Sequence, residues 1–432
     1  MKYKIVILAG FGLILIIAAL AFVFGRVGGG SEFSGELKIW SFEPPAVWEE
    51  LIAAFETQHK NLRITYSQKN PSTYENELLN ALAAGTGPDI FFIHHQWLLK
   101  HADKIAPLPE NFISPAEFGT TFVDVASKDL VRDGRVWALP FYVDTLAFYY
   151  NKTLFNAAGV PLPPATWEEF SETVTRLTQR DSSGNIVRSG AALGTASNVA
   201  YAGDIVAALM LQTGTIMIDP VTGQAIFDRG VTLDNRFYEP GKAALTFYTD
   251  FSDPAKSVYT WNRGFLNSRE AFEKGETAIY FGYAKDRPQI AESGISFAVS
   301  PFPQVKKAGE DPSYIPLTYA DYWAGAVSKS NPNREAAWNF LLFATSRNAL
   351  FNFLSKAGLA TARRDLVEIQ SANADLAVFS RQVLTADSWL EPDPQSVDQI
   401  FNTMIDDVVL GRANAEEAIR QAAIEVNELW ER

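Results

Sequence analysis

The sequence predicts an α/β fold made of two bodies, and two observations carry that prediction. From Glu36 to Ile93 the pattern alternates strand, helix, strand, helix and strand, an order that favours a parallel sheet covered by helices. Further along, Phe141–Tyr150 is extended and apolar on both faces, which is typical of a strand buried on both sides. This strand carries Tyr142 and Asp144, so we interpret it as a segment that passes between two bodies with polar groups directed into the gap.

The elements of the first body follow from hydrophobic spacing. Leu37–Phe42, Leu62–Tyr66 and Ile90–Ile93 are apolar runs of strand length, and apolar residues at helical spacing lie between them. Ligands of open parallel sheets bind beyond the carboxyl ends of the strands, so the residues found there are candidates for a binding site. They are Trp40, Ser41, Phe42, Glu43, His94, His95, Gln96 and Trp97.

Turn and cap signals surround the strand that passes between the bodies. Asp133-Gly134, placed between two short apolar runs, predicts a hairpin. Asn151 can cap a short helix. Thr166 and Glu169 have the spacing of a capping box at the start of the next helix.

A second α/β body is predicted after Asn151. Its helices and strands follow from the same spacing rules. The segments are Tyr201–Leu211, Thr277–Gly282, Ile295–Pro301, Asn333–Ala344, Val397–Leu410 and Ala415–Trp430.

Composition narrows the function classes. The chain has 432 residues, of which 47% are hydrophobic and 20% charged, as expected for a globular protein of more than one domain. Its net charge of −13 disfavours nucleic acids and anionic membrane surfaces as partners. The absence of cysteine excludes disulfides, thiolate metal sites, cysteine nucleophiles and a lipid-modified cysteine. No P-loop, GxSxG, HExxH or dinucleotide motif is present, so we expect neither a catalytic site nor a cofactor.

The N-terminus predicts a membrane anchor. Ile5–Phe24 is a run of 20 residues without a charge, close to the ~20 needed to cross a bilayer. This run exceeds the usual apolar core of a cleaved signal, so we interpret 1–26 as an uncleaved anchor, with a cleaved signal as the alternative. Two lysines before the run and one arginine after it favour a cytoplasmic N-terminus. The Gly/Ser-rich residues 27–35 would tether the rest of the chain on the extracytoplasmic side.

Several segments, in order, resemble a known family. They are AAGTGPDIFFI (83–93), DGRVWALPFYVDTLAFYYNKTLFNAAGV with TWEEF (133–170), AFEKGETAIYFGY (271–283), WAGAVSKSNPNREAAWNFLLFATS running on to GLATARRD (323–365), and the end of the chain (410–430). Together they resemble the extracellular solute-binding proteins of family 1, the carbohydrate-type receptors of ABC importers. One departure is Phe281-Gly282-Tyr283, where the family often has Gly-Pro-Trp.

The resemblance implies a two-lobed periplasmic-binding-protein-like fold of type II, similar to maltose-binding protein, with discontinuous lobes joined by hinge strands. It implies a first lobe of 36–143 and 298–354 and a second of 144–297 and 355–432. Asp144–Phe148 and Ile295–Ser300 would be hinge crossings that let the lobes close on a ligand. It also implies docking on a permease, and we expect a monomer.

Aromatic faces and planar polar side chains are the groups that hold sugars. The candidate ligand-binding residues are Trp40, Phe42, Glu43, His95, Trp97, Tyr142, Asp144, Tyr283, Tyr322, Trp323 and Arg363, with Asn198, Tyr201 and Asp204 as weaker candidates.

Each candidate has a structural alternative. Trp40 and Phe42 could belong to the core, and Glu43 could be a surface charge at a helix start. Asp144 could bond the ligand or only the opposite lobe. Arg363 could clamp a ligand or pair with the nearby Asp365.

The histidine pair also admits two interpretations. His95 could line the cleft or have a structural role. No third ligand is suggested by the spacing around His94 and His95, so no metal site is predicted.

These observations predict a non-catalytic extracytoplasmic receptor that captures a sugar or oligosaccharide and delivers it to an ABC-type permease. The alternatives are a receptor that presents its ligand to a membrane sensor and a binding protein for a non-sugar solute. A glycoside hydrolase that uses Glu43 and Asp144 as its two carboxyl groups is the least favoured.

Overall fold

The computed structural model describes residues 33–233, 235–306 and 314–431, and the chain forms two units, one ending at Pro88 and one beginning at Asp89. The predicted anchor Ile5–Phe24 lies outside the described residues, as does most of the predicted tether 27–35. In the part of the chain that the structure describes, no helix has the length and apolarity required to span a membrane. The predicted lobe boundaries stay a prediction.

The first unit is a βαβ arrangement followed by a helix. Its elements are β1 (Ser34–Ser41), α2 (Pro45–Gln58), β2 (Asn61–Gln68) and α3 (Tyr74–Ala83). β1 and β2 are parallel, as predicted, and Leu37 lies opposite Ile64. The buried side chains Trp48, Leu51 and Phe55 of α2 supply the apolar face of the unit.

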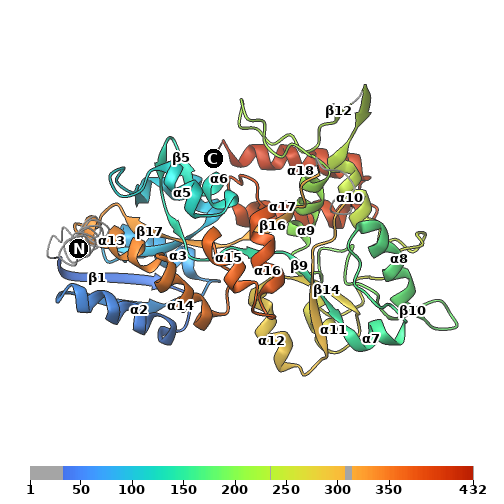
Figure 1. Cartoon of the computed structure of the whole chain (residues 1–432). Helices are drawn as coiled ribbons and strands as arrows, with labels where there is room; N and C mark the ends of the chain where they lie inside the picture. Colours follow the sequence, from blue (N-terminus) through green and yellow to red (C-terminus); the bar gives the residue numbers. More distant parts are fainter. Residues whose placement is uncertain (1–32, 234, 307–313, 432) are drawn as a thin grey trace, which may run out of the picture. The chain divides into compact units, whose positions relative to one another are not determined.

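The second unit contains a sheet built around β17 (Trp323–Ser328). This strand pairs antiparallel with β3 (Ile90–His94), β4 (Ile105–Ala106) and β7 (Leu139–Pro140). The helix α13 (Arg334–Ala344) lies beside β17 (Figure 1), and α14 (Arg347–Ala357) follows it. Gly325 permits this packing, because a Cβ there would lie 2.7 Å from the Leu341 side chain.

A separate sheet has β9 (Ala147–Asn151) between β14 (Ile279–Gly282) and β15 (Phe297–Pro301), with both pairings antiparallel. A large apolar core lies on it and includes Phe148, Phe170 and Phe281. Four helices pack with one another beside this sheet (Figure 1). They are α9 (Ala202–Gln212), α10 (Pro240–Asp250), α17 (Pro394–Val409) and α18 (Ala415–Leu429).

Short strands connect these two sheets. β8 (Asp144–Thr145) pairs antiparallel with β16 (Thr318–Asp321), and β16 pairs in parallel with β18 (Ala386–Asp387). The single strand predicted over 141–150 is therefore interrupted, because β8 pairs with β16 whereas β9 pairs with β14 and β15. The chain passes from one sheet to another here, since β7, β8 and β9 follow one another along the chain and belong to different sheets. The predicted passage between two bodies stays a prediction.

The local turn and cap predictions are confirmed, with one difference. Asp133 and Gly134 both adopt positive φ, as a two-residue hairpin turn requires. The Asn151 side chain accepts from two backbone amides of the next helix. Thr166 Oγ1 accepts from the Glu169 N–H at 3.2 Å, but the Glu169 carboxylate accepts from Ala165 N–H, so only half of the predicted capping box forms.

The remaining elements are mostly short. The helices are α4 (Leu98–His101), α5 (Pro115–Thr121), α6 (Asp124–Leu130), α7 (Lys152–Ala157), α8 (Trp167–Leu177), α11 (Ser268–Glu273), α12 (Arg287–Glu292), α15 (Arg364–Gln370) and α16 (Ala377–Gln382), with the 3₁₀ turns η1 (His95–Trp97), η2 (Ala102–Lys104), η3 (Ala284–Asp286) and η4 (Val383–Thr385). The strands are β5 (Val131–Arg132), β6 (Arg135–Val136), β10 (Gln179–Arg180), β11 (Ile186–Arg188), β12 (Val231–Leu233) and β13 (Arg236–Tyr238).

Candidate ligand-binding site

A cavity of about 160 Å³ lies in the second unit, where α9, β16, η1 and the start of α17 meet. Gly203 lets α9 approach α17 at its wall, because a Cβ there would lie 3.3 Å from Asp398 Oδ1. The lining residues are Gln96, Gly203, Asp204, Ala207, Tyr319, Trp389, Glu391, Pro394, Val397, Asp398 and Phe401.

Gln96, Tyr319 and Glu391 form a hydrogen-bond network at this cavity. Glu391 Oε1 accepts from the Tyr319 hydroxyl at 3.0 Å and also from Gln96 Nε2. Gln96 Nε2 lies 3.2 Å from the Tyr319 hydroxyl oxygen. Burial, reinforced by the charge of Asp204, raises the pKa of Glu391 well above its usual value. The network therefore offers a carboxyl, an amide and a phenol in a site that favours uncharged groups.

Asp204 adds a second carboxyl group to the wall. Its Oδ2 accepts from the Tyr283 hydroxyl at 2.7 Å. Burial, together with the negative charge of Asp321, raises the pKa of Asp204 to about 7. Tyr283 itself is fully buried and packs edge-on against Tyr201, with ring centroids 4.8 Å apart. The predicted cleft aromatic Tyr283 thus orients Asp204 in this structure.

Trp389 supplies the aromatic surface of the cavity. It is buried and packs against Phe227 and Phe401, with ring centroids 6.0 and 5.7 Å away. No lysine or arginine occurs among the described residues that line the cavity. Such a cavity suits a neutral ligand that carries hydroxyl groups and an apolar face.

An ionic cluster of His94, Asp144, Lys285 and Asp321 lies at the other end of β16. Asp321 Oδ1 lies 2.7 Å from His94 Nε2, and Asp321 Oδ2 accepts from the Lys285 ammonium. Burial alone would raise the pKa of Asp321, but Lys285 and His94 hold it well below its usual value. Asp321 is therefore a carboxylate that is already paired with two partners.

Asp144 lies opposite Asp321 in the β8–β16 pair and is only 1% exposed. Its carboxylate accepts from the backbone N–H groups of Thr145, Ala284 and Lys285 at 2.9, 2.8 and 3.0 Å. Burial raises the pKa of Asp144 to about 7, against the opposing effect of Lys285. Both oxygens of this side chain are therefore engaged, and they tie β8 to η3, so neither of the two predicted roles, a bond to the ligand or to the opposite lobe, is seen in these contacts.

The predicted aromatic and histidine residues at the end of β3, in η1 and at the start of β17 lie together. Trp97 packs edge-on against Trp323 with centroids 4.9 Å apart, and His94 does so at 5.2 Å from Trp323. His95 stacks on Tyr322 at 4.5 Å. Trp323 is the most exposed of the three large aromatic side chains here, because Tyr322 and Trp97 are buried.

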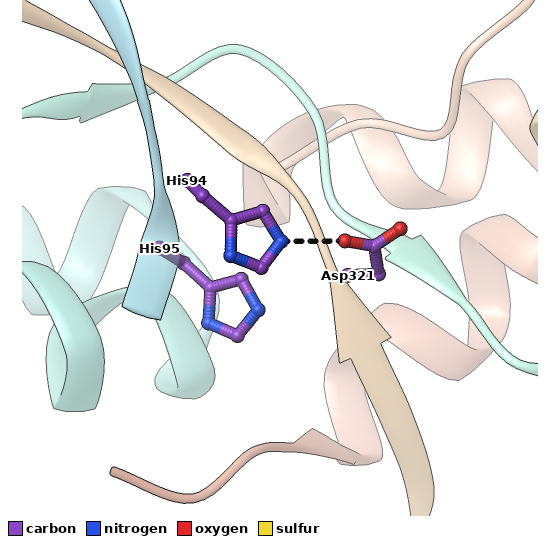
Figure 2. Close-up of side chains that lie close together, drawn as sticks. All are labelled: His94, His95 and Asp321. Carbon is purple, nitrogen blue, oxygen red and sulfur yellow. Dashed lines mark hydrogen bonds and ion pairs between the residues drawn. The ribbon is translucent and has the colours of Figure 1, made fainter. Parts of the chain in front are cut away.

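Figure 2 shows a feature that the sequence spacing did not suggest, a third potential metal ligand beside the histidine pair. His94, His95 and Asp321 each offer one ligand atom, and these atoms lie within 4.8 Å of one another. Asp321 follows His94 by 227 positions, so only the fold brings it to this place.

Two further predicted residues of the second unit have structural partners. Arg363 donates from Nε and Nη2 to the two oxygens of Asp365 at 2.9 and 3.0 Å, and from Nη1 to the Thr345 carbonyl. This is the structural alternative foreseen for it. Tyr142 is 8% exposed and forms an isolated bridge with Thr361.

The first unit holds Trp40, Phe42 and Glu43. Lys69 Nζ lies 3.6 Å from the centroid of the half-buried Trp40 ring, and Phe42 packs edge-on against Tyr74. Glu43 is 8% exposed, so it is not the surface charge considered as its alternative. Its carboxylate accepts from Ser41 Oγ at 2.7 Å and Trp48 Nε1 at 3.3 Å.

Tyr319, Trp389 and Glu391 were missed by the sequence analysis, and Gln96 was noted only as a residue at a strand end. Trp389 and Glu391 lie in an irregular segment before α17, where no periodicity marks a site. The signal that could have found them is the aromatic and acidic composition of Trp389–Asp393, just ahead of a helix that begins with Pro394.

The family model described as bacterial extracellular solute-binding protein matches residues 40–349. The chain belongs to this family. The predicted resemblance is therefore confirmed, and with it the non-catalytic, extracytoplasmic nature of the protein, because the members of this family are extracellular binding proteins and not enzymes.

Individual relatives are distant but cover much of the chain. A binding protein of Brucella abortus (strain 2308) is 23% identical over 98% of this chain and 97% of its own length. A maltotriose-binding protein of Pyrococcus abyssi is 24% identical over 72% of this chain and 63% of its own length. The solved structure of the cyclic alpha-maltosyl-1,6-maltose binding protein of Arthrobacter globiformis matches with a TM-score of 0.74 at 19% identity, covering 92% of this chain and 99% of that one. This likeness confirms the two-lobed α/β periplasmic-binding-protein-like fold.

Proposed function

We propose that this protein is the receptor of an ABC-type importer and that it captures a sugar or oligosaccharide. The observation that carries the proposal is the network of Gln96, Tyr319 and Glu391 beside Trp389, in a cavity lined by no lysine or arginine among its described residues. Hydroxyl groups of a sugar match these donors and acceptors, and the apolar face of a pyranose ring matches the indole. Relatives named for maltotriose and cyclic alpha-maltosyl-1,6-maltose support the same class.

The charge of the cavity argues against other solute classes. Solutes that carry an anionic group, such as amino acids, peptides and phosphate esters, need a cation or a cluster of backbone amides at that group. Here Asp204, Glu391 and Asp398 supply acidic groups to the wall. Burial raises the pKa of all three carboxyl groups, which disfavours the ionised forms that would attract a cationic solute. A neutral, hydroxyl-rich ligand is the remaining match.

Several finer features belong to the same proposal. Trp97 of η1, Tyr322 and Trp323 of β17 would be the aromatic ligand-binding residues of the second unit. Trp40, Phe42 and Glu43 are the proposed ligand-binding residues of the first unit. The protein would act as a monomer held at the membrane by 1–26. Because 5–24 carries no charge over a bilayer-spanning length, the anchored form should remain with the membrane fraction after a wash with high salt.

A ligand screen tests the proposed function. Thermal unfolding of the purified full-length chain would be followed with maltotriose, maltotetraose, cyclic glucans, diacetylchitobiose, amino acids, short peptides and polyamines. A ligand present at 100 times its Kd stabilises the folded state by about 2.7 kcal/mol, which raises the unfolding temperature by a few degrees. We expect such a shift with at least one carbohydrate. A shift with a peptide or polyamine and with no carbohydrate would contradict the sugar assignment, and release of a hydrolysis product would contradict a non-catalytic receptor.

A further inference from the structure

The cluster of His94, His95 and Asp321 has a rigid backbone frame (Figure 2). In the β3–β17 pair, Trp323 lies opposite His94, and the His95 N–H donates to the Tyr322 carbonyl at 3.1 Å. Asp321 is the next residue back along the chain, where β16 leads into β17. The ring centroids of the two histidines are 4.4 Å apart, and the Asp321 carboxylate lies beside them. Three potential ligands are thus held by main-chain hydrogen bonds and not by a loose loop.

The hydrogen bonds of His95 prepare it as a metal ligand. Its Nδ1 lies 2.8 Å from Asp129 Oδ2, and this carboxylate is itself held by the Tyr322 hydroxyl at 2.9 Å and by Ser388 Oγ at 2.7 Å. A carboxylate that accepts from Nδ1–H leaves the lone pair on Nε2, which is the arrangement found behind histidine ligands of zinc. Nε2 of His95 is buried and has no hydrogen-bond partner among the described residues.

An imidazole nitrogen of this kind needs an explanation, because buried polar atoms normally have a partner. His94 presents a similar case, since its Nδ1 is also buried and without a partner in the described part of the chain. A bound cation would satisfy the lone pair of His95.

The surrounding charges allow a cation. Asp129 and Asp321 supply two carboxylates, and Lys285 supplies one ammonium group on the far oxygen of Asp321. That ammonium group holds the Asp321 carboxylate in place, and the other oxygen, Oδ1, faces His94 and lies 2.7 Å from its Nε2. Two imidazoles and one carboxylate favour zinc and its neighbours among the transition metals, and disfavour Mg²⁺ and Ca²⁺, which prefer all-oxygen sites.

We propose that His94, His95 and Asp321 form a binding site for one divalent transition-metal ion of the zinc type, with Asp129 as the residue that orients His95. Ligand atoms within 4.8 Å of one another need shifts of less than about 1 Å to reach the metal–ligand distances of about 2.0–2.2 Å. Three protein ligands leave a fourth position open to water or to a solute. The site does not depend on the proposed sugar-binding function.

Metal titration of the full-length chain tests the site. The chain would be expressed without a histidine tag, stripped with a chelator, and titrated with Zn²⁺ by calorimetry and with Co²⁺ by visible absorption, in the absence of sugar. We expect saturation at one ion per chain. His95→Gln and Asp321→Asn should each weaken binding by more than about 100-fold, and Asp129→Asn by about 10–100-fold, as is usual for a residue that orients a ligand.

His101→Gln is the matched control, because His101 is also a buried histidine, on α4, and belongs to no cluster of metal-ligating groups in the described residues. It should leave the zinc affinity unchanged. Circular dichroism would establish that each variant is folded. The absence of saturable zinc uptake by the unchanged chain would overturn the proposal, as would equal losses in His101→Gln and His95→Gln. If a variant does not fold, the Co²⁺ spectrum of the unchanged chain tests the proposal instead. A spectrum identical to that of the hydrated ion would also overturn the proposal.

Discussion

The two ends of β16 use acidic side chains in opposite ways. Tyr319, near the start of the strand, belongs to the cavity, where burial raises the pKa of Glu391 and Asp204. Asp321, two positions later, belongs to the ionic cluster, where its pKa is held well below the usual value. The cause of the difference is direct contact with the Lys285 ammonium and with His94.

Asp144 shows that contact matters more than proximity. It lies opposite Asp321 in the β8–β16 pair, yet its pKa is raised to about 7. Asp144 accepts a hydrogen bond from the backbone N–H of Lys285, whereas Asp321 accepts one from the Lys285 ammonium group itself. Burial therefore prevails at Asp144, and ion pairing prevails at Asp321. Where burial prevails, as in the cavity, the site suits a neutral ligand. Where carboxylates stay ionised, as in the ionic cluster, the site suits a cation.

The largest expected effect is a pH dependence of stability that arises from Asp144. Its pKa of about 7 in the folded state exceeds that of an unfolded aspartate, about 3.9, so between these values the folded state binds more protons. Its contribution to stability is therefore greatest below pH 4 and falls as the pH rises to 7, with a slope that approaches 1.4 kcal/mol per pH unit, from about 2.303RT per proton.

Urea unfolding at several pH values between 4.5 and 7.5 would measure this, with Asp144→Asn as the comparison. The variant loses one acceptor for a backbone N–H and should be less stable at low pH, but its side chain does not titrate. The difference in unfolding free energy between the two proteins should therefore shrink as the pH rises. A difference that is constant over this range would mean that Asp144 is already ionised at pH 4.5.

Two substitutions that remove a carboxyl group without changing the size of the side chain compare the ionic cluster with the cavity more directly. Asp321→Asn removes the charge that pairs with Lys285 and His94, so we expect a loss of about 1.5–3 kcal/mol in the free energy of unfolding, the range for hydrogen bonds to charged groups. Glu391→Gln removes a charge that burial disfavours, since burial raises the pKa of Glu391, and it should cost less than about 1 kcal/mol. Chemical unfolding at pH 7 would measure both losses. Equal losses would contradict the distinction drawn between the two ends of β16.

A smaller effect is expected on ligand affinity at the cavity. Glu391→Ala removes the acceptor shared by Tyr319 and Gln96, so the sugar that responds best in the ligand screen should bind about tenfold more weakly, equivalent to about 1.4 kcal/mol. Glu391→Gln should retain most of the affinity. Glu428→Ala, at an exposed position of α18, is the matched control and should have no effect. Calorimetric titration gives the three values, and full affinity in Glu391→Ala would place the ligand elsewhere.

The sequence predicted local structure better than it predicted the cavity. Asn151 and Asp133-Gly134 could be placed because a cap or a turn depends on residues a few positions apart. Phe141–Tyr150 was recognised as a crossing segment, but not as two short strands, because strand pairing with β16 and β14 depends on residues far along the chain.

The same limit applies to the site residues. Tyr283, Asp144 and the weaker candidate Asp204 were selected, yet the contacts of Tyr283 with Asp204 and of Asp144 with η3 were not predicted, and these contacts determine what the side chains do. Gln96 and Glu391 are 295 positions apart, and so are invisible to any spacing rule. The family resemblance could predict that a cleft exists. It could not predict which carboxyl groups in the site are paired with a cation.

The smallest effect is expected at Arg363, which lies in neither of the two regions. Its guanidinium donates to both oxygens of Asp365 and to the Thr345 carbonyl, so each of its three nitrogens already has a protein partner. Arg363→Gln should therefore change sugar affinity by less than about twofold, which is within 0.4 kcal/mol. Its effect on stability should also be small, since the Asp365 side chain is 44% exposed and surface ion pairs contribute about 0–1 kcal/mol. A tenfold loss of affinity would show instead that Arg363 leaves Asp365 to clamp the bound ligand.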